Sequence, residues 1–323
     1  MEKKDLRIVY MGTPEFAVES LKALTEGGYH VVGVVTMPDK PAGRGMKLQS
    51  SPVKQYAREH LLPLLQPERL KDPEFLEALK DWKADLQIVV AFRMLPEAVW
   101  NMPRLGTFNL HASLLPQYRG AAPINWAIIN GECETGVTTF FLTHTIDTGH
   151  IIGQQRVAIA ETDTAGTLHD RLMLVGSQLV TDTVDRILSG TVEPIDQDRL
   201  LTPETILKPA PKIFRDTCRI EWNQPVAALY NFVRGLSPYP AAWTELLTVK
   251  GEPIRLKIFE VEIHRTSSAH PSGTVLTDGK TCLDVVAADG IVRLLTIQPA
   301  GKVKMPTREF LKGCKLLVES AFP

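Results

Sequence analysis

Short apolar runs alternate with helical hydrophobic patterns along the first part of the chain. The run Leu6–Met11 is rich in strand-forming residues and ends at residues 12–14, where the threonine can cap a helix and the proline can occupy its first turn. Apolar residues then recur at helical spacing until Gly27, and a second apolar run covers His30–Thr36. This pattern predicts a strand, a helix and a second strand, which together form one βαβ unit.

The same alternation continues further along the chain. Capping signals predict helices that begin near Ser51 and Asp72, and apolar runs predict strands over Leu86–Phe92 and Gly106–His111. Helical periodicity over Thr164–Leu188 closes this region. Strands that alternate with helices are typical of an α/β fold, so we predict a Rossmann-like, doubly wound, mostly parallel sheet with helices on both faces.

A different pattern follows a polar stretch. Residues 189–208 are rich in Pro, Asp and Thr, which is typical of a linker. Beyond it we predict one helix, Val226–Gly235, and five short strands separated by Gly and Asp-Gly turns. The strands are expected at Trp243–Val249, Ile254–Ile263, Gly273–Leu276, Cys282–Ala287 and Ile291–Ile297. Five short strands predict a small β-barrel, so we expect a catalytic domain over 1–188, the linker, and a barrel domain over 209–323.

The composition is that of an ordinary globular protein. Hydrophobic residues make up 44% of the chain and charged residues 23%, which argues against disorder. No apolar stretch approaches the length of a membrane span, and the apolar part of the first ten residues is too short for a signal peptide. We therefore expect a cytoplasmic protein without a membrane partner. The four cysteines form no Cys-x-x-Cys pair, so we expect unpaired thiols.

The charge is distributed unevenly. The net charge is −1, yet residues 209–323 hold 15 Lys and Arg against 11 Asp and Glu. A basic C-terminal part on an acidic body is compatible with a polyanionic partner, although an excess of this size is also common on solvated surfaces.

Three polar side chains stand at or after predicted strands. Asn109 and His111 are two positions apart in the sequence Thr-Phe-Asn-Leu-His, so they project from the same face of a strand, at its carboxyl end. Asp147 follows another strand-like run, Val137–Leu142. An amide, an imidazole and a carboxylate suit acyl transfer to an amine, because they can stabilise an oxyanion and move protons.

Other interpretations of these residues remain open at this point. Each side chain can simply satisfy a local hydrogen bond. His144 and His150 flank Asp147 and can recruit zinc together with His111, although their spacing fits no familiar zinc motif. A dinucleotide site at the first strand–helix turn is disfavoured, because that turn has one glycine where the fingerprint needs three.

The sequence that follows His111 decides between these interpretations. Residues 111–124 read HASLLPQYRGAAPI, and together with the upstream Asn and the distant Asp-x-Gly segment they resemble the signature of folate-dependent formyltransferases. The resemblance implies that 10-formyltetrahydrofolate is the formyl donor and that no metal is needed. It implies catalytic roles for Asn109, His111 and Asp147. It also implies that the tetrahydrofolate pocket is lined by Ser113, Leu114, Leu115 and Pro116.

A basic loop suggests the acceptor. Residues 36–48 form a loop that contains Gly and Pro and three basic side chains, and it resembles the inserted loop of the branch of this family that formylates methionine on initiator tRNA. Lys and Arg can neutralise phosphates, while glycines let the main chain approach closely. The resemblance implies that initiator Met-tRNA is the partner and that its contacts include Lys40, Arg44 and Lys47.

Further matches support this branch. They lie at Met11–Phe16, Ile220–Trp222 and Gln298–Lys302, and the C-terminal domain of that branch resembles an OB-fold that lies along the tRNA. The segment Val90–Pro96 departs from the usual family sequence near the pterin ring. Two alternatives remain, namely a formyltransferase for a sugar or nucleotide amine and a non-catalytic RNA-binding relative. We expect a monomer.

Overall fold

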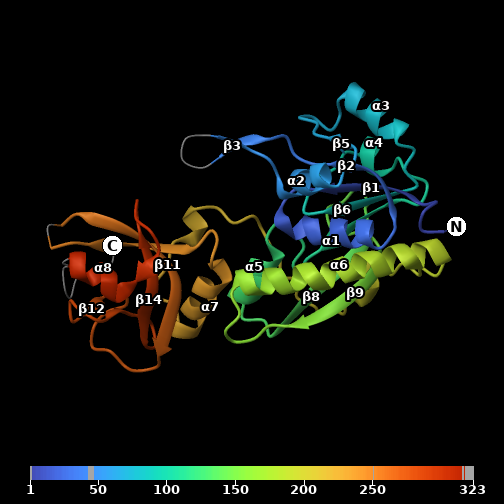
Figure 1. Ribbon diagram of the computed structural model, residues 1–323. Coiled ribbons are helices and arrows are strands. Elements are labelled where there is room, and N and C mark those ends of the chain that lie inside the picture. The colour runs from blue at the N-terminus through green and yellow to red at the C-terminus, as the bar shows by residue number, and fades with distance from the viewer. Residues whose placement is uncertain (1, 43–46, 250, 315, 317–323) are drawn as a thin grey trace. The chain divides into compact units, whose positions relative to one another are not determined.

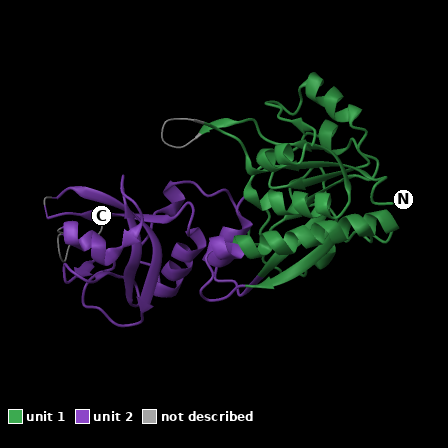
Figure 2. Ribbon diagram, in the orientation of Figure 1, with its two compact units in different colours: residues 1–120, 135–158, 169–209 green, residues 121–134, 159–168, 210–323 purple. Residues whose placement is uncertain are grey.

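The computed structural model describes residues 2–42, 47–249, 251–314 and 316. The chain divides into two compact units (Figure 2). The first consists of residues 1–120, 135–158 and 169–209, and the second of residues 121–134, 159–168 and 210–323. Two short segments that the sequence interpretation placed in the first domain, 121–134 and 159–168, therefore belong to the second unit.

A seven-stranded sheet forms the centre of the first unit (Figure 1). Its strand order is β5-β2-β1-β6-β7-β8-β9. The pairs from β5 to β7 are parallel, and β7 and β8 are antiparallel. The strands are β1 (Arg7–Gly12), β2 (His30–Val35), β5 (Leu64–Leu65), β6 (Leu86–Val90), β7 (Thr107–His111), β8 (Glu134–Phe141) and β9 (Ile151–Ala158). The predicted mostly parallel sheet is confirmed.

Two helices of this unit begin at recognisable capping residues. Ser51 accepts a hydrogen bond from the main-chain N–H of Lys54, and Asp72 accepts one from that of Glu74. Thr13 does not cap the first helix as expected, because Pro14 occupies the cap position and the Thr13 hydroxyl is buried without a hydrogen-bond partner. The helices are α1 (Glu15–Glu26), α2 (Pro52–Glu59), α3 (Pro73–Asp81), α4 (Glu97–Trp100) and α6 (Ala165–Ser189).

Helices cover both faces of the sheet, as the sequence predicted (Figure 1). On one face, Val9 and Val89 pack in a cluster with Phe75 and Leu79 of α3. On the other face, α6 lies close to the sheet at Gly176, where an added Cβ would come within 2.8 Å of the Leu110 side chain. The sequence shows the helical spacing, but the need for glycine at this contact emerges only from the packing.

The basic loop of the sequence interpretation is a two-stranded hairpin. Strand β3 (Lys40–Ala42) pairs with β4 (Lys47–Gln49) in antiparallel fashion. At its base the ammonium of Lys54, a residue only 4% exposed, lies 2.6 Å from a carboxylate oxygen of Asp39. This hydrogen bond lowers the pKa of Asp39. A buried lysine is costly unless it is paired, so this contact fixes the hairpin to α2.

An antiparallel sheet of six strands forms most of the second unit. The strands are β10 (Ala242–Leu247), β11 (Pro253–His264), β12 (Val275–Thr277), β13 (Leu283–Val286), β14 (Ile291–Pro299) and β15 (Met305–Pro306). The helices are α5 (Pro123–Ile129), α7 (Val226–Leu236) and α8 (Thr307–Gly313). All five predicted strands are present, while β15 and α8 were not foreseen. Irregular register in β11 around Phe259 bends that strand and helps the sheet to curl into a small barrel.

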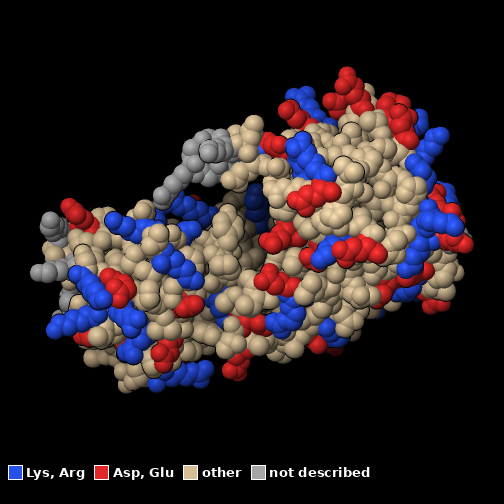
Figure 3. Space-filling model, viewed as in Figure 1, with Lys and Arg blue, Asp and Glu red and all other residues tan. Residues whose placement is uncertain are grey.

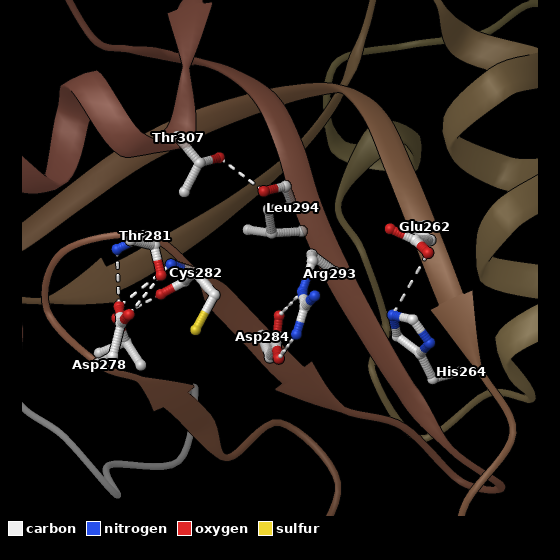
Figure 4. Close-up of polar contacts among 10 residues, drawn as sticks. Glu262, His264, Asp278, Thr281, Cys282, Asp284, Arg293, Leu294 and Thr307 are labelled. Atoms are coloured by element: carbon white, nitrogen blue, oxygen red, sulfur yellow. Dashed lines mark hydrogen bonds and ion pairs between the residues drawn. The ribbon is translucent and has the colours of Figure 1, made fainter.

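Polar contacts hold the strands of the barrel in register (Figure 4). The guanidinium of Arg293 on β14 donates two hydrogen bonds, of 2.8 and 2.9 Å, to the carboxylate of Asp284 on β13. Asp278 accepts hydrogen bonds from the Thr281 hydroxyl and from the main-chain N–H groups of residues 280–282. These bonds hold the pKa of Asp278 well below its usual range and close the turn between β12 and β13.

Within the described residues, no helix combines the length and the apolar character that crossing a bilayer requires.

Candidate active site

Asn109 and His111 lie at the carboxyl end of β7. Asn109 pairs with Val89 of β6, so it projects to the same side of the sheet as the apolar cluster beneath α3. Leu110 between them points to the opposite side, toward α6. Asn109 is half-buried, and His111 is buried, with 7% of its surface exposed. The strand thus places an amide and an imidazole side by side at the sheet edge where α/β proteins bind ligands.

The imidazole of His111 is held by a main-chain carbonyl. Its Nε2 lies 2.9 Å from the carbonyl oxygen of Tyr118. A carbonyl oxygen can only accept a hydrogen bond, so Nε2 carries a proton. Tyr118 itself has a left-handed backbone, with φ of 59°, and its N–H donates to the carbonyl of Lys208. Nδ1 of His111 is therefore the ring nitrogen that remains for proton exchange or for donation to a ligand.

Asp147 lies in a loop that is anchored by the same short segment. Its Oδ2 accepts a hydrogen bond of 3.0 Å from the main-chain N–H of Gly120, two residues beyond Tyr118. The backbone of Asp147 is left-handed, with φ of 55°. Gly149 closes this loop so tightly against Phe141 that a Cβ at this position would lie 1.6 Å from the Phe141 carbonyl oxygen.

The segment Tyr118–Gly120 therefore connects the imidazole and the carboxylate. Its first carbonyl binds His111 and its last N–H binds Asp147. The sequence predicted catalytic roles for His111 and Asp147, but it gave no role to residues 118–120. These residues lie within the motif. Their hydrogen bonds come from the main chain, which is the same for every residue type, so the sequence could not reveal them.

The four residues expected to line the folate pocket differ in accessibility. Ser113 is completely buried, and its hydroxyl donates to the Gln117 carbonyl at 2.6 Å. Leu115 is 2% exposed and packs in an apolar cluster with Phe140. Leu114 and Pro116 are half-buried. Leu114 and Pro116 are thus the more accessible of the four, while Ser113 and Leu115 pack inside the loop, and the folate contacts of all four stay a prediction.

A mostly apolar cavity of about 610 Å³ opens on the α3 and α4 side of the first unit. Arg93, Met94 and Leu95, which belong to the segment that departs from the usual family sequence, form part of its wall. The Arg93 guanidinium donates to the carbonyl of Glu68 at 2.8 Å, and burial lowers its pKa. Apolar walls with a few oriented polar groups are typical of small-molecule sites.

The histidines of the zinc alternative differ in their exposure and in their contacts. His144 is exposed and stacks edge-on against Trp100, with ring centroids 5.2 Å apart, and His150 is also exposed. His111 is buried beside Tyr118. Among the residues that the structure describes, no three His, Cys, Asp or Glu side chains come together as a metal site.

Two of the three predicted tRNA contacts lie on the strands of the β3–β4 hairpin. Lys40 is exposed in β3, and Lys47 is the first residue of β4. Arg44 lies outside the described residues.

A basic and aromatic groove of about 970 Å³ lies in the second unit. Its basic side chains outnumber the single carboxylate, Glu245, and are Lys212, Arg215, Arg255 and Lys257. Its aromatic side chains include Phe214, which is 60% exposed, and Tyr239, which is 80% exposed. Lys and Arg side chains are also numerous on the face of this unit that Figure 3 displays. Sequence analysis found the charge excess but did not foresee the exposed aromatic rings.

Comparisons with known proteins agree with this architecture. Residues 6–184 match the family model described as formyl transferase, and residues 212–315 match the one described as formyl transferase, C-terminal domain. Among solved structures, HypX from Aquifex aeolicus in complex with tetrahydrofolic acid has a TM-score of 0.63 at 19% identity, over 97% of this chain and 49% of that chain. A sugar 3N-formyl transferase, WlaRD, has a TM-score of 0.62 at 18% identity, over 92% and 99%. At such identities the likeness shows a shared fold.

Curated relatives are much more similar in sequence. The methionyl-tRNA formyltransferase of Bacteroides thetaiotaomicron is 64% identical over 98% of both chains. That of Porphyromonas gingivalis is 48% identical, again over 98% of both chains. Both compact units are covered by these matches. The chain therefore belongs to the formyl transferase family and, within it, to the methionyl-tRNA formyltransferases.

Proposed function

We propose that this chain transfers a formyl group from 10-formyltetrahydrofolate to the α-amine of methionine on initiator tRNA. The observation that carries the proposal is the arrangement at the end of β7, where Asn109 and His111 share one face and the Tyr118–Gly120 segment binds both His111 and Asp147. The relatives of 48–64% identity, all methionyl-tRNA formyltransferases, support the acceptor.

In the proposed reaction the free α-amine attacks the formyl carbon. A C–N bond forms, the carbonyl oxygen becomes an oxyanion, and the bond from that carbon to N10 of the folate then breaks. The amine loses a proton and N10 gains one, so tetrahydrofolate leaves as a neutral amine. Asn109 donates from its amide to the oxyanion, a contact that strengthens as charge develops.

The geometry of His111 suggests its protonation state during this step. Because Nε2 donates to the Tyr118 carbonyl, a neutral imidazole has no proton on Nδ1. We therefore propose that His111 acts as an imidazolium, which keeps its bond to Tyr118 and donates from Nδ1 to the oxyanion. Asp147 then accepts the proton of the amine, directly or through water.

We propose that the barrel domain binds the tRNA, in the predicted division of the chain into a catalytic domain (1–188), a linker (189–208) and a tRNA-binding domain (209–323). The groove provides cations such as Arg255 and Lys257 for phosphates and exposed rings such as Phe214 for stacking on bases. Lys40 and Lys47 on the hairpin strands, and Arg44 outside the described residues, remain predicted tRNA contacts.

An acceptor assay tests this function. Purified protein is given 10-formyltetrahydrofolate with charged initiator Met-tRNA, charged elongator Met-tRNA or free methionine. We expect rapid formylation of the initiator alone. Transfer to a sugar or nucleotide amine but to none of these three would favour the first alternative, and tRNA binding without any transfer would favour a non-catalytic relative.

A further inference from the structure

A buried glutamine lies behind the loop that carries Asp147. Gln197 is the first residue of a short 3₁₀ helix, Gln197–Leu200, in the segment that the sequence interpretation treated as a linker. It is 1% exposed. Its amide nitrogen donates to the main-chain carbonyls of Asp147 and Gly149, at 2.9 and 2.8 Å. Its amide oxygen accepts from Nε and Nη2 of Arg119, at 3.1 and 2.6 Å.

These partners leave the glutamine one orientation. Carbonyl oxygens only accept and a guanidinium only donates, so the Gln197 nitrogen faces the Asp147 loop and its oxygen faces Arg119. Both protons of the amide nitrogen are used, and its oxygen accepts two bonds. A buried amide with all its hydrogen bonds made is rigid, because any rotation leaves polar atoms unpaired.

These contacts hold Asp147 at both its main chain and its side chain. Gln197 holds the main-chain carbonyl of Asp147, while Gly120, which follows Arg119 in the chain, holds its carboxylate. The left-handed backbone of Asp147 is a conformation that non-glycine residues rarely adopt, so the surroundings must impose it. Gln197 constrains the main chain of Asp147 through its carbonyl, and Gly120 constrains the side chain through its carboxylate.

The same chain segment also reaches the anchor of His111. The Gln117 amide donates to the Ile206 carbonyl at 2.9 Å and accepts from the Lys208 N–H at 2.9 Å. The Lys208 carbonyl in turn accepts from the N–H of Tyr118, the residue that binds His111. Residues 197–208 therefore hydrogen-bond both to the loop that carries Asp147 and to the segment that binds His111.

We infer that Gln197 is a positioning residue for formyl transfer: through its amide, which is oriented by Arg119, it fixes the backbone of Asp147 so that the carboxylate meets the attacking amine in one orientation. This inference rests on the proposed function and goes beyond it, because the proposed reaction gives no role to Gln197, which is 1% exposed. A misplaced carboxylate still permits both substrates to bind but slows the proton transfer that accompanies attack.

The test measures single-turnover formyl transfer to initiator Met-tRNA by wild type, Gln197→Met and Asp147→Asn, together with the KM of each substrate. We expect Gln197→Met to lower the rate by about 10- to 100-fold, as outer residues that orient a reacting group commonly do, with each KM within about twofold of wild type. Gln178→Met, a change to an exposed glutamine on α6, serves as the control and should leave the rate unchanged.

The double variant separates positioning from general destabilisation. If Gln197 acts only through Asp147, adding Gln197→Met to Asp147→Asn should lower the rate little further. Full additivity of the two losses, or a wild-type rate for Gln197→Met, would overturn the inference. Absence of transfer by the wild-type protein would instead overturn the proposed function.

A second variant covers the case in which Gln197→Met fails to fold. Arg119→Met leaves the Gln197 side chain in place and removes only the group that orients its oxygen. We expect a loss of several-fold in the rate and unchanged KM values, with Arg119→Lys restoring part of the rate, and a Tm that falls because the buried Gln197 oxygen loses its donors but stays above the assay temperature. A wild-type rate for Arg119→Met would contradict the inference.

Discussion

His111 and Asp147 are each held by a main-chain group of the same three-residue segment. The Tyr118 carbonyl fixes the tautomer of the imidazole, and the Gly120 N–H fixes one oxygen of the carboxylate. Such partners are not altered by side-chain substitution at Tyr118 or Gly120, provided that the backbone keeps its conformation. The chemistry at this scale therefore depends on backbone geometry as much as on residue type.

Asn109→Ala tests the role of the amide. Because the amide donates to an oxygen that gains charge only during the reaction, we expect kcat to fall by roughly 10²–10³-fold, as for other oxyanion donors. The KM of each substrate should change little. Steady-state kinetics with initiator Met-tRNA checks this, and a large rise in KM with unchanged kcat would assign Asn109 to substrate binding instead.

Residue type together with the resemblance to folate-dependent formyltransferases pointed to Asn109, His111 and Asp147, but neither could reveal Gln197. The partners of Gln197 lie 48 to 78 positions away in the chain, so only the folded structure brings them together. Its neighbours are Asp, Arg and Leu, and a polar stretch of this kind is typical of a linker. The left-handed backbone of Asp147 was equally invisible in the sequence, because aspartate in a turn adopts several conformations.

Among the elements, the regular helices and strands followed from the sequence and the irregular ones did not. Period and capping residues predicted α2, α3, β1 and β2 within a few residues. The β3–β4 hairpin has proline and glycine where alternation would be needed, so it was interpreted as a loop. Its base is held by the contact between Asp39 and the buried Lys54, which are 15 positions apart, so the local sequence pattern could not predict it.

The Asp39–Lys54 pair is expected to fix the base of this hairpin. Asp39→Ala leaves a buried ammonium without its carboxylate, so we expect a lower Tm and, because the hairpin is freed, a higher KM for tRNA. Adding Lys54→Met removes the orphaned charge and should recover most of the Tm. Thermal unfolding of the single and double variants measures this, and a double variant less stable than Asp39→Ala would contradict the pairing.

The Asp278 turn predicts how the stability of the barrel depends on pH. The pKa of Asp278 is lower in the folded protein than in the unfolded chain, so its contribution is present above the unfolded pKa of about 4 and is lost as the pH falls below it. Asp278→Ala should therefore lower the Tm at pH 7, and the difference from wild type should shrink between pH 4 and pH 2. A difference that is constant with pH would show that the charge of Asp278 is irrelevant.

On the scale of the whole molecule, the sequence indicated a catalytic α/β part and a basic barrel, and both are present in the structure. It did not indicate that residues 121–134 and 159–168 join the second unit. Arg234 of α7 donates to the carbonyls of Ala160 and Asp163, at 3.1 and 2.9 Å, and so ties one of these segments to that unit. Contacts of this kind, between residues far apart in the sequence, determine which segments belong to each unit. They cannot be predicted from the amino-acid composition.

The basic groove of the second unit predicts a salt dependence. If Arg255 and Lys257 each neutralise a phosphate, replacing either by Ala should weaken tRNA binding and reduce the slope of log Kd against log salt by about 1. Phe214→Ala should weaken binding without changing the slope, because stacking releases few ions. Filter binding at several salt concentrations measures both effects, and unchanged slopes for Arg255→Ala and Lys257→Ala would place the tRNA elsewhere.

The most direct test of the central claim is single-turnover transfer of a ¹³C-labelled formyl group from 10-formyltetrahydrofolate to initiator Met-tRNA. We expect wild-type protein to label the α-amine of methionine, and we expect Asn109→Ala and Asp147→Asn to bind both substrates but to transfer at least about 10²-fold more slowly. Transfer by these variants at the wild-type rate, or no labelled product from the wild-type protein, would contradict it.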